Sequence, residues 1–226
     1  DNSGQANNYS IVSASSDITQ RPLNLSGSRA YDSTRTASGS DLSFTNIVSG
    51  ETLGLTGSGV LDSPAAGSRT IVNTNTLAIS DGSGIATNYT LTNGTLTMTI
   101  VPRSTTVSGT KTYDGTTNVA SSNLTSFSNL AGSDTLSLSG TGTISTADVG
   151  TGKTVNASGL TIDNSSGVGS NYTLSAATVN VTERVIGLSG VRAFDGTNNV
   201  SSADLSISNL VSCLLYTSDA ADERHC

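Results

Sequence analysis

The sequence is poor in the residues on which most enzymes and nucleic-acid-binding proteins depend. Its 226 residues include no Trp, one His, two Cys and three Pro, and charged residues make up only 12% of the chain. Globular domains usually carry about 25% charged residues. The formal net charge of −7 argues against a basic surface that would neutralise nucleic-acid phosphates or anionic lipids. We therefore expect neither nucleic acid nor an anionic membrane among its partners.

Long hydrophobic runs and targeting signals are also missing. No apolar run approaches the roughly 20 residues of a membrane-spanning helix, so we expect no membrane insertion. The chain begins at Asp1 rather than Met, and it shows no signal peptide. We expect it to be a fragment of a longer protein, in which case the missing export signal says nothing about export.

The abundant residues are Ser, Thr, Asn and Gly, with 24 Gly in the chain. Ser and Thr suit the exposed faces of β-strands, whereas Asn and Gly suit turns. Apolar residues at every second position, as at Leu96, Met98 and Ile100, predict strands with one buried face. Turn clusters such as Asp114-Gly115 separate these runs. The pattern predicts an all-β fold rather than a cytosolic enzyme or a disordered tail.

Internal repetition is the strongest feature of the sequence. A nine-residue signature occurs three times, at residues 26–34, 108–116 and 189–197. Its aromatic residue recurs at a nearly fixed period, since Tyr113 follows Tyr31 by 82 residues and Phe194 follows Tyr113 by 81. A second motif, Asn-Tyr-Ser/Thr, closes the repeats at Tyr9, Tyr89 and Tyr172. Repetition at a fixed period indicates a tandem array.

These markers divide the chain into the end of one repeat, two full repeats, the start of a further repeat and a tail, at residues 1–20, 21–102, 103–183, 184–212 and 213–226. A β-helix repeats every 20–30 residues or so, whereas a repeat of this length can bury a small core of its own. We predict tandem β-rich modules of about 80 residues, each a small β-sandwich-like bead of about six or seven strands. A continuous β-solenoid is the alternative. Each bead is expected to draw support from neighbouring repeats.

The signature admits two interpretations, a ligand site or a structural element. We favour the structural one, because an aromatic residue at a strand end would anchor the core while the following Asp and Gly form a turn. The closing tyrosines are expected to pack beside Ser or Thr. The candidate structural residues are Tyr31, Asp32, Tyr113, Asp114, Gly115, Phe194, Asp195 and Gly196, together with Tyr9, Tyr89 and Tyr172.

No pattern in the sequence points to catalysis. The only His and both Cys lie in the tail, so triads that need a His base are not expected elsewhere. The acidic residues are scattered and lie mostly in turns. We expect no enzyme activity, no cofactor and no metal site. A weaker alternative is calcium bound by oxygen ligands in the turns at residues 81–84 and 163–164.

The tail breaks the repeat at a single residue. The chain stays in register through Ser212, and Cys213 then stands where the first repeat has Gly50. Residues 213–223 resemble the translation of a transposase-type sequencing adapter. We expect the tail to be a non-native read-through, so that the native chain would contain neither Cys nor His.

Three stretches of the second repeat, residues 111–117, residues 140–142 followed by 147–150, and residues 169–174, resemble the YDG repeat domain of large bacterial surface exoproteins of the filamentous-haemagglutinin type. The resemblance extends over residues 1–212, with departures at Ser33 in place of Gly and at Phe194 in place of Tyr. It implies an all-β array that projects from a Gram-negative-type surface, often after secretion through a partner outer-membrane transporter. It implies a role in adhesion and supplies no catalytic residues.

Two functions follow as expectations for an extracellular or cell-surface protein. The repeats are either a passive stalk that holds a distal adhesive domain away from the cell, or they themselves bind host or matrix glycans or proteins. A binder would present a shared exposed patch with aromatic or charged anchors. The scarcity of aromatic residues, at 4% of the chain, favours the stalk.

Overall fold

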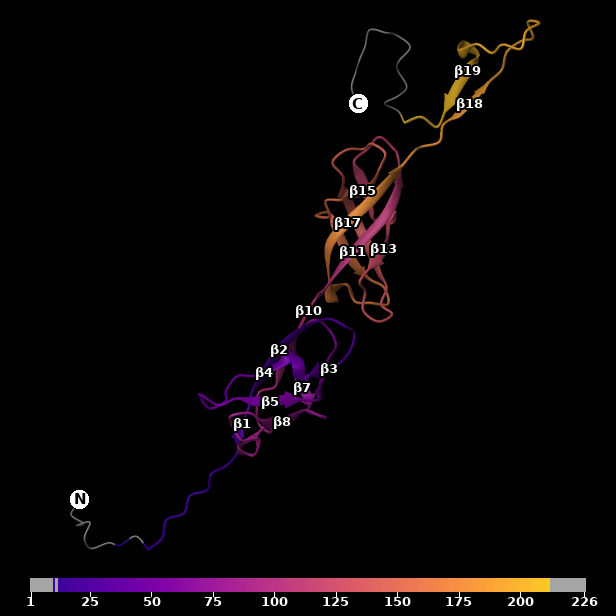
Figure 1. The fold of residues 1–226 in the computed structure, drawn as a ribbon. Helices are drawn as coiled ribbons and strands as arrows, with labels where there is room; N and C mark the ends of the chain where they lie inside the picture. The colour runs from indigo at the N-terminus through magenta and orange to yellow at the C-terminus, as the bar shows by residue number, and fades with distance from the viewer. Residues whose placement is uncertain (1–9, 11, 212–226) are drawn as a thin grey trace, which may run out of the picture. The chain divides into compact units, whose positions relative to one another are not determined.

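The computed structural model describes residue 10 and residues 12–211 (Figure 1). The predicted closing residue Tyr9 and the tail at 213–226 lie outside this range. The described residues form β-strands and short 3-10 turns, and they contain no α-helix. None of these helical turns is long and apolar enough to cross a membrane. The prediction of an all-β chain built from tandem modules is confirmed.

The chain divides into two compact units. The first consists of Asp1–Arg29 and Thr34–Val101, and the second of Ala30–Ser33 and Pro102–Cys226. The main division between the units lies between Val101 and Pro102. The segment Ala30–Ser33 is the exception, because it belongs to the first repeat by sequence and to the second unit by its contacts.

The strands of the first full repeat are β1 (Arg21–Pro22), β2 (Leu25–Ala30), β3 (Thr36–Ser38), β4 (Leu42–Phe44), β5 (Leu53–Thr56), β6 (Ser58–Leu61), β7 (Gly67–Asn73), β8 (Ala78–Asp81), β9 (Tyr89–Thr90) and β10 (Thr97–Val101). Its 3-10 turns are η2 (Gly39–Asp41) and η3 (Ala86–Asn88). One sheet has the order β3-β6-β7-β10-β2-β4, and β1-β9 and β5-β8 form separate pairs.

The second full repeat contains β11 (Arg103–Thr112), β12 (Asn118–Ala120), β13 (Leu124–Ser128), β14 (Leu136–Thr143), β15 (Gly150–Thr154), β16 (Leu160–Asn164) and β17 (Tyr172–Thr182), with turns η4 (Ser121–Asn123) and η5 (Gly169–Asn171). These strands form two sheets, of order β13-β11-β17-β15 and β12-β14-β16. The first repeat shares the first of these orders, since β4-β2-β10-β7 matches β13-β11-β17-β15 strand for strand, but there β3 and β6 extend the same sheet.

The first and last strands of the second repeat are parallel neighbours (Figure 1). Their register runs from Arg103 beside Tyr172 to Thr112 beside Thr182. The repeat therefore begins at one end of this sheet and finishes at the other. The first repeat has the same feature, because β2 lies next to β10 and Leu25 pairs in parallel with Leu96.

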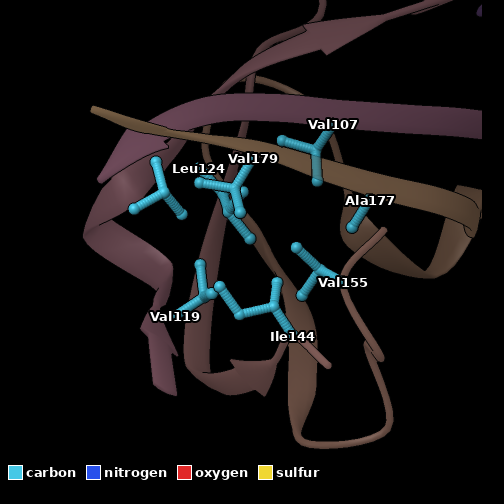
Figure 2. Close-up of a cluster of buried hydrophobic side chains, with 8 residues drawn as sticks. Val107, Val119, Leu124, Ile144, Val155, Ala177 and Val179 are labelled. Carbon is cyan, nitrogen blue, oxygen red and sulfur yellow. The ribbon is translucent and has the colours of Figure 1, made fainter. Parts of the chain in front are cut away.

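The core of the second repeat lies between its two sheets (Figure 2). Val107 and Val179 point inward from β11 and β17, and they meet Val119 of β12 and Ile144, which directly follows β14. Ala177, Val179 and Val181 of β17 are buried at alternate positions, as the period-2 pattern predicts for Val179 and Val181. Aliphatic side chains fill this core, which accommodates the low aromatic content.

The third signature begins a further β-hairpin, in which β18 (Gly187–Gly190) pairs with β19 (Leu205–Ser208) after turn η6 (Ser202–Asp204). This hairpin corresponds to the β11–β13 pair of the second repeat. Its apolar residues are largely exposed, with Leu188 at 63% and Ile207 at 51%.

Candidate functional site

Tyr31, the aromatic residue of the first signature, is buried among residues of the second compact unit. Only 5% of its surface is exposed. Its hydroxyl donates a hydrogen bond to Oδ2 of Asp134 at 3.1 Å. Its ring meets that of Tyr172 edge to face, with ring centres 5.4 Å apart and an interplanar angle of 76°. The signature of one repeat thus completes the packing of the next.

Asp134 joins the two tyrosines through one carboxylate oxygen. The hydroxyl of Tyr172 donates to the same Oδ2 at 2.6 Å and accepts a hydrogen bond from the backbone N–H of Ala131 at 3.0 Å. Burial, together with the hydrogen bond to Asp134, raises the pKa of Tyr172 to about 12. The same two causes raise the pKa of Tyr31. Both phenols are therefore neutral donors at physiological pH.

Arg103 supports this cluster from the start of β11. Its Nε donates to the carbonyl of Asn129 at 2.8 Å, and its Nη2 donates to Oδ1 of the same Asn at 2.7 Å. A third nitrogen, Nη1, donates to the carbonyl of Tyr31 at 3.3 Å. The amide of Asn129 completes the contact by donating to the carbonyl of Ser104 at 2.7 Å. The guanidinium thus fixes a loop and the signature backbone together.

The arginine–asparagine pair recurs at the start of each repeat. Arg21 donates through Nε to the carbonyl of Asn46 at 3.0 Å, and Arg184 donates in the same way to Asn209 at 2.7 Å. Arg21, Arg103 and Arg184, which we call the junction arginines, therefore have a common structural role.

The first unit contains a counterpart of the Asp134 cluster. Tyr89 is 4% exposed, and its hydroxyl donates to the carboxylate of Glu51, which raises the pKa of this tyrosine. Glu51 closes its turn through a hydrogen bond from its N–H to the carbonyl of Val48 at 3.0 Å. Asp134 makes the same bond to Ala131, also at 3.0 Å. Glu51 and Asp134 are thus equivalent residues.

Two overlapping stretches, residues 18–98 and 95–180, match the family model of the YDG domain. Together they cover more than half of the chain. The chain belongs to the YDG domain family. No curated protein and no solved structure matches it.

The Asp-Gly-Thr part of the YDG signature forms a tight turn. Oδ1 of Asp114 accepts hydrogen bonds from both N–H and Oγ1 of Thr116, each at 2.9 Å. Gly115 has a φ of 76°, in the left-handed region that favours glycine. Gly196 has a φ of 83° at the same position, and Ser33 adopts 66° there. The departure of Ser33 from the family pattern therefore leaves the turn intact.

A basic residue, two positions before the signature aromatic residue, closes the same turn. Lys111 is 4% exposed and donates through Nζ to the carbonyls of Thr116 and Asn118. It also forms an ion pair with Asp114 at 2.9 Å. Partial burial alone would raise the pKa of Asp114, but the hydrogen bonds from Lys111 and Thr116 bring it below its ordinary value. Arg192 pairs with Asp195 in the same way, at 2.6 Å, and lowers the pKa of that carboxyl.

The three signature aromatics differ in burial. Tyr31 is buried, and Tyr113 is partly buried against the core of the second repeat. Phe194 is 91% exposed, which differs from the packing expected of a signature aromatic. The acid that accepts the bond from Tyr31 lies 103 residues further along the chain. No described residue lies that far beyond Phe194.

The turns considered for calcium use their side chains internally. Oδ1 of Asp81 accepts a hydrogen bond from the N–H of Ala86 at 2.7 Å, and Oδ1 of Asn164 accepts one from Gly169 at 2.7 Å. Each bond holds the first N–H of its turn, η3 or η5, in an equivalent way. Among residues 10 and 12–211, no group of three or more His, Cys, Asp or Glu side chains is placed to hold a metal ion.

Glu51, Asp134 and the junction arginines were not among the candidate residues from the sequence. Both acids precede Thr-Leu-x-Leu in the same register of the repeat, and this recurrence was the available signal. The sequence did not show that the partners are tyrosines, one of them from another repeat.

Proposed function

We propose that these YDG repeats form a structural stalk in a large secreted or surface-displayed bacterial protein of the adhesin type. The observation that carries the proposal is the parallel pairing of β11 and β17. The repeat begins at Arg103 and finishes at Thr182, and these residues lie at opposite ends of one sheet. A module of this kind passes the chain forward instead of returning it to its starting point.

The length of the first strand sets the advance per repeat. β11 contains 10 residues, and a strand rises about 3.3 Å per residue, which gives about 30 Å per repeat. A compact domain whose ends lie together would add little length to a chain. A tandem array of these modules instead gains reach with each copy, as a stalk requires.

The packing of Tyr31 supports the same role. A signature residue that is buried by Asp134 and Tyr172 uses its aromatic ring to join repeats, and so it is not presented to a ligand. The family resemblance adds the expected setting, which is the extracellular face of a bacterial cell reached through an outer-membrane secretion partner. In this setting the stalk would hold a distal adhesive domain away from the cell.

The test measures length against the number of repeats. Further copies of residues 103–183 would be inserted after Glu183, and small-angle X-ray scattering would give the maximum dimension of each protein. We expect an increase of about 30 Å for each added copy. A maximum dimension that grows only as the cube root of the mass would indicate a compact array and would contradict the stalk.

A further inference from the structure

The first unit contains a cavity at the place that corresponds to the binding site of Tyr31. The cavity has a volume of about 480 Å³, and its lining includes Arg21, Val48, Glu51, Asn88 and Tyr89. The corresponding residues of the second repeat are Arg103, Ala131, Asp134, Asn171 and Tyr172. We call the first set the first-unit pocket and the second set the second-unit pocket.

Four of the five residues of the second-unit pocket act directly on Tyr31. Asp134 accepts its hydroxyl hydrogen bond, and Arg103 donates to its carbonyl. Tyr172 packs against the ring of Tyr31. A hydrogen bond with the side chain of Asn171 opposes the rise in the pKa of Tyr31. The second-unit pocket is therefore a site for a tyrosine whose backbone carbonyl is also recognised.

Burial distinguishes the two pockets. Ala131 is 3% exposed in the second-unit pocket, whereas its counterpart Val48 is 44% exposed. Asn171 is also 3% exposed, whereas its counterpart Asn88 is exposed. The backbone turns around these residues are equivalent, with the same hydrogen bond at 3.0 Å. The two pockets thus share a framework but differ in how far their walls are covered.

We infer that the first-unit pocket binds the signature tyrosine of another YDG repeat. Its carboxylate, Glu51, takes the place of Asp134 as acceptor for the incoming hydroxyl. Tyr89, which is 4% exposed, stands in the place of Tyr172, and Arg21 holds the position from which Arg103 reaches a backbone carbonyl. This inference adds to the proposed stalk function the contact that joins neighbouring repeats, which we call the joint. It rests on that function only because it requires repeats in tandem.

The chemistry of the pocket selects this occupant over an acidic or a basic side chain. A carboxylate from a ligand would be repelled by Glu51, and a basic side chain would be repelled by Arg21, which also lines the pocket. A phenol avoids both repulsions, because it presents an apolar ring and one neutral donor. A small sugar, which also stacks on aromatic rings, is the competing occupant that the test distinguishes.

The test is a titration of the isotope-labelled full chain with a nine-residue peptide that has the sequence of residues 26–34, followed by nuclear magnetic resonance. A joint that closes within one chain works at an effective concentration of millimolar order, so its affinity in trans must be about 1 mM or tighter. We expect shifts centred on Val48, Glu51 and Tyr89. A peptide with Ala in place of its Tyr should bind at least about tenfold more weakly.

The matched variants are Val48→Arg, which places a large charged side chain in the first-unit pocket, and Val72→Arg, at a valine of β7 that is 59% exposed and does not line this pocket. We expect Val48→Arg to weaken peptide binding about tenfold or more and Val72→Arg to leave it within about twofold of the parent. Spectra of the remaining first-unit residues report whether each variant is folded.

Three results would overturn the inference. They are no shift at a peptide concentration of about 5 mM, equal binding of the Ala peptide, and displacement of the shifts to residues outside the pocket. Binding of simple sugars to the same residues without binding of the peptide would assign the pocket to a glycan instead. None of these results would change the expected increase in length of about 30 Å per repeat. The peptide titration can therefore contradict the joint without contradicting the stalk, and the scattering experiment can do the reverse.

Discussion

At the scale of single residues, most side chains of the signature stabilise the turn to which they belong. Lys111 satisfies two carbonyls of the turn, Asp114 caps the turn, and Gly115 allows its left-handed backbone. Tyr31 performs a task of a different kind, because its partners lie in another repeat. One carboxylate oxygen of Asp134 accepts two phenolic hydrogen bonds, and this arrangement requires both phenols to stay protonated.

This requirement predicts a loss of stability in alkali. The pKa of Tyr172 rises from 10.0 to about 12 on folding, so its contribution is complete below pH 10 and is lost as the pH rises toward 12. The unfolded chain ionises first, which lowers the free energy of unfolding by an amount on the order of 2 kcal/mol. Denaturant unfolding of the parent and of Tyr172→Phe across this range is the measurement.

The comparison isolates Tyr172, because every other titratable side chain is common to the two proteins. We expect the stability difference between the two proteins to be constant below pH 10 and to shrink between pH 10 and pH 12. A difference that stays constant up to pH 12 would mean that the hydroxyl is not held in its neutral form by the fold.

At the scale of elements, a close backbone contact explains the glycine that opens the signature. A Cβ on Gly109 of β11 would lie 1.7 Å from the carbonyl oxygen of Asn123, at the end of turn η4. The counterparts Gly27 and Gly190 have a carbonyl oxygen at 1.9 Å from the same position. The strand and the turn therefore approach each other too closely for any side chain, in all three copies.

We predict that Gly109→Ala lowers the free energy of unfolding by more than about 2 kcal/mol, because a backbone carbonyl must move to admit the methyl group. The matched control is Gly150→Ala in β15, where the nearest atom to the new Cβ is a Lys153 side-chain carbon at 3.7 Å. We expect this control to remain within about 1 kcal/mol of the parent. Equal stability of the two variants in urea would show that the turn can shift at little cost.

Local sequence patterns predicted the strands and turns. They did not predict the contacts between residues that are distant in the sequence. Alternation at Leu96, Met98 and Ile100 identified a buried strand face, and all three residues are 9% exposed or less. The turn at Asp114-Gly115 followed from residue type alone. In contrast, the parallel pairing of β11 with β17 joins residues about 70 positions apart, and no periodicity within either strand encodes that choice. The contact of Tyr31 with Asp134 has the same character.

At the scale of the whole molecule, the repeat unit of the sequence and the packing unit of the structure differ by one short segment. Ala30–Ser33 belongs to the first repeat by its signature and to the second unit by its contacts. A repeat taken alone therefore has a tyrosine whose partners lie elsewhere and a pocket suited to a tyrosine from elsewhere. Arrays built in this way gain stability from nearest-neighbour contacts.

This offset predicts that a substitution in the first repeat destabilises the second unit. Tyr31→Ala removes a ring that is 5% exposed and leaves Asp134 and Tyr172 uncovered, so we expect the opening free energy of residues 103–182 to fall by about 2–3 kcal/mol. Residue-resolved hydrogen exchange measures this directly, because each amide reports the stability of its own unit. The protected amides of β11 and β17 are the reporters.

Phe194→Ala is the matched control, since it truncates the signature aromatic that is 91% exposed. This variant should leave exchange in residues 103–182 unchanged to within about 0.5 kcal/mol, because surface truncations rarely cost more. Faster exchange confined to residues 34–101 in Tyr31→Ala would contradict the offset, since the tyrosine would then stabilise the repeat to which it belongs by sequence. Faster exchange in the second unit would establish that the signature tyrosine of one repeat stabilises the repeat that follows it.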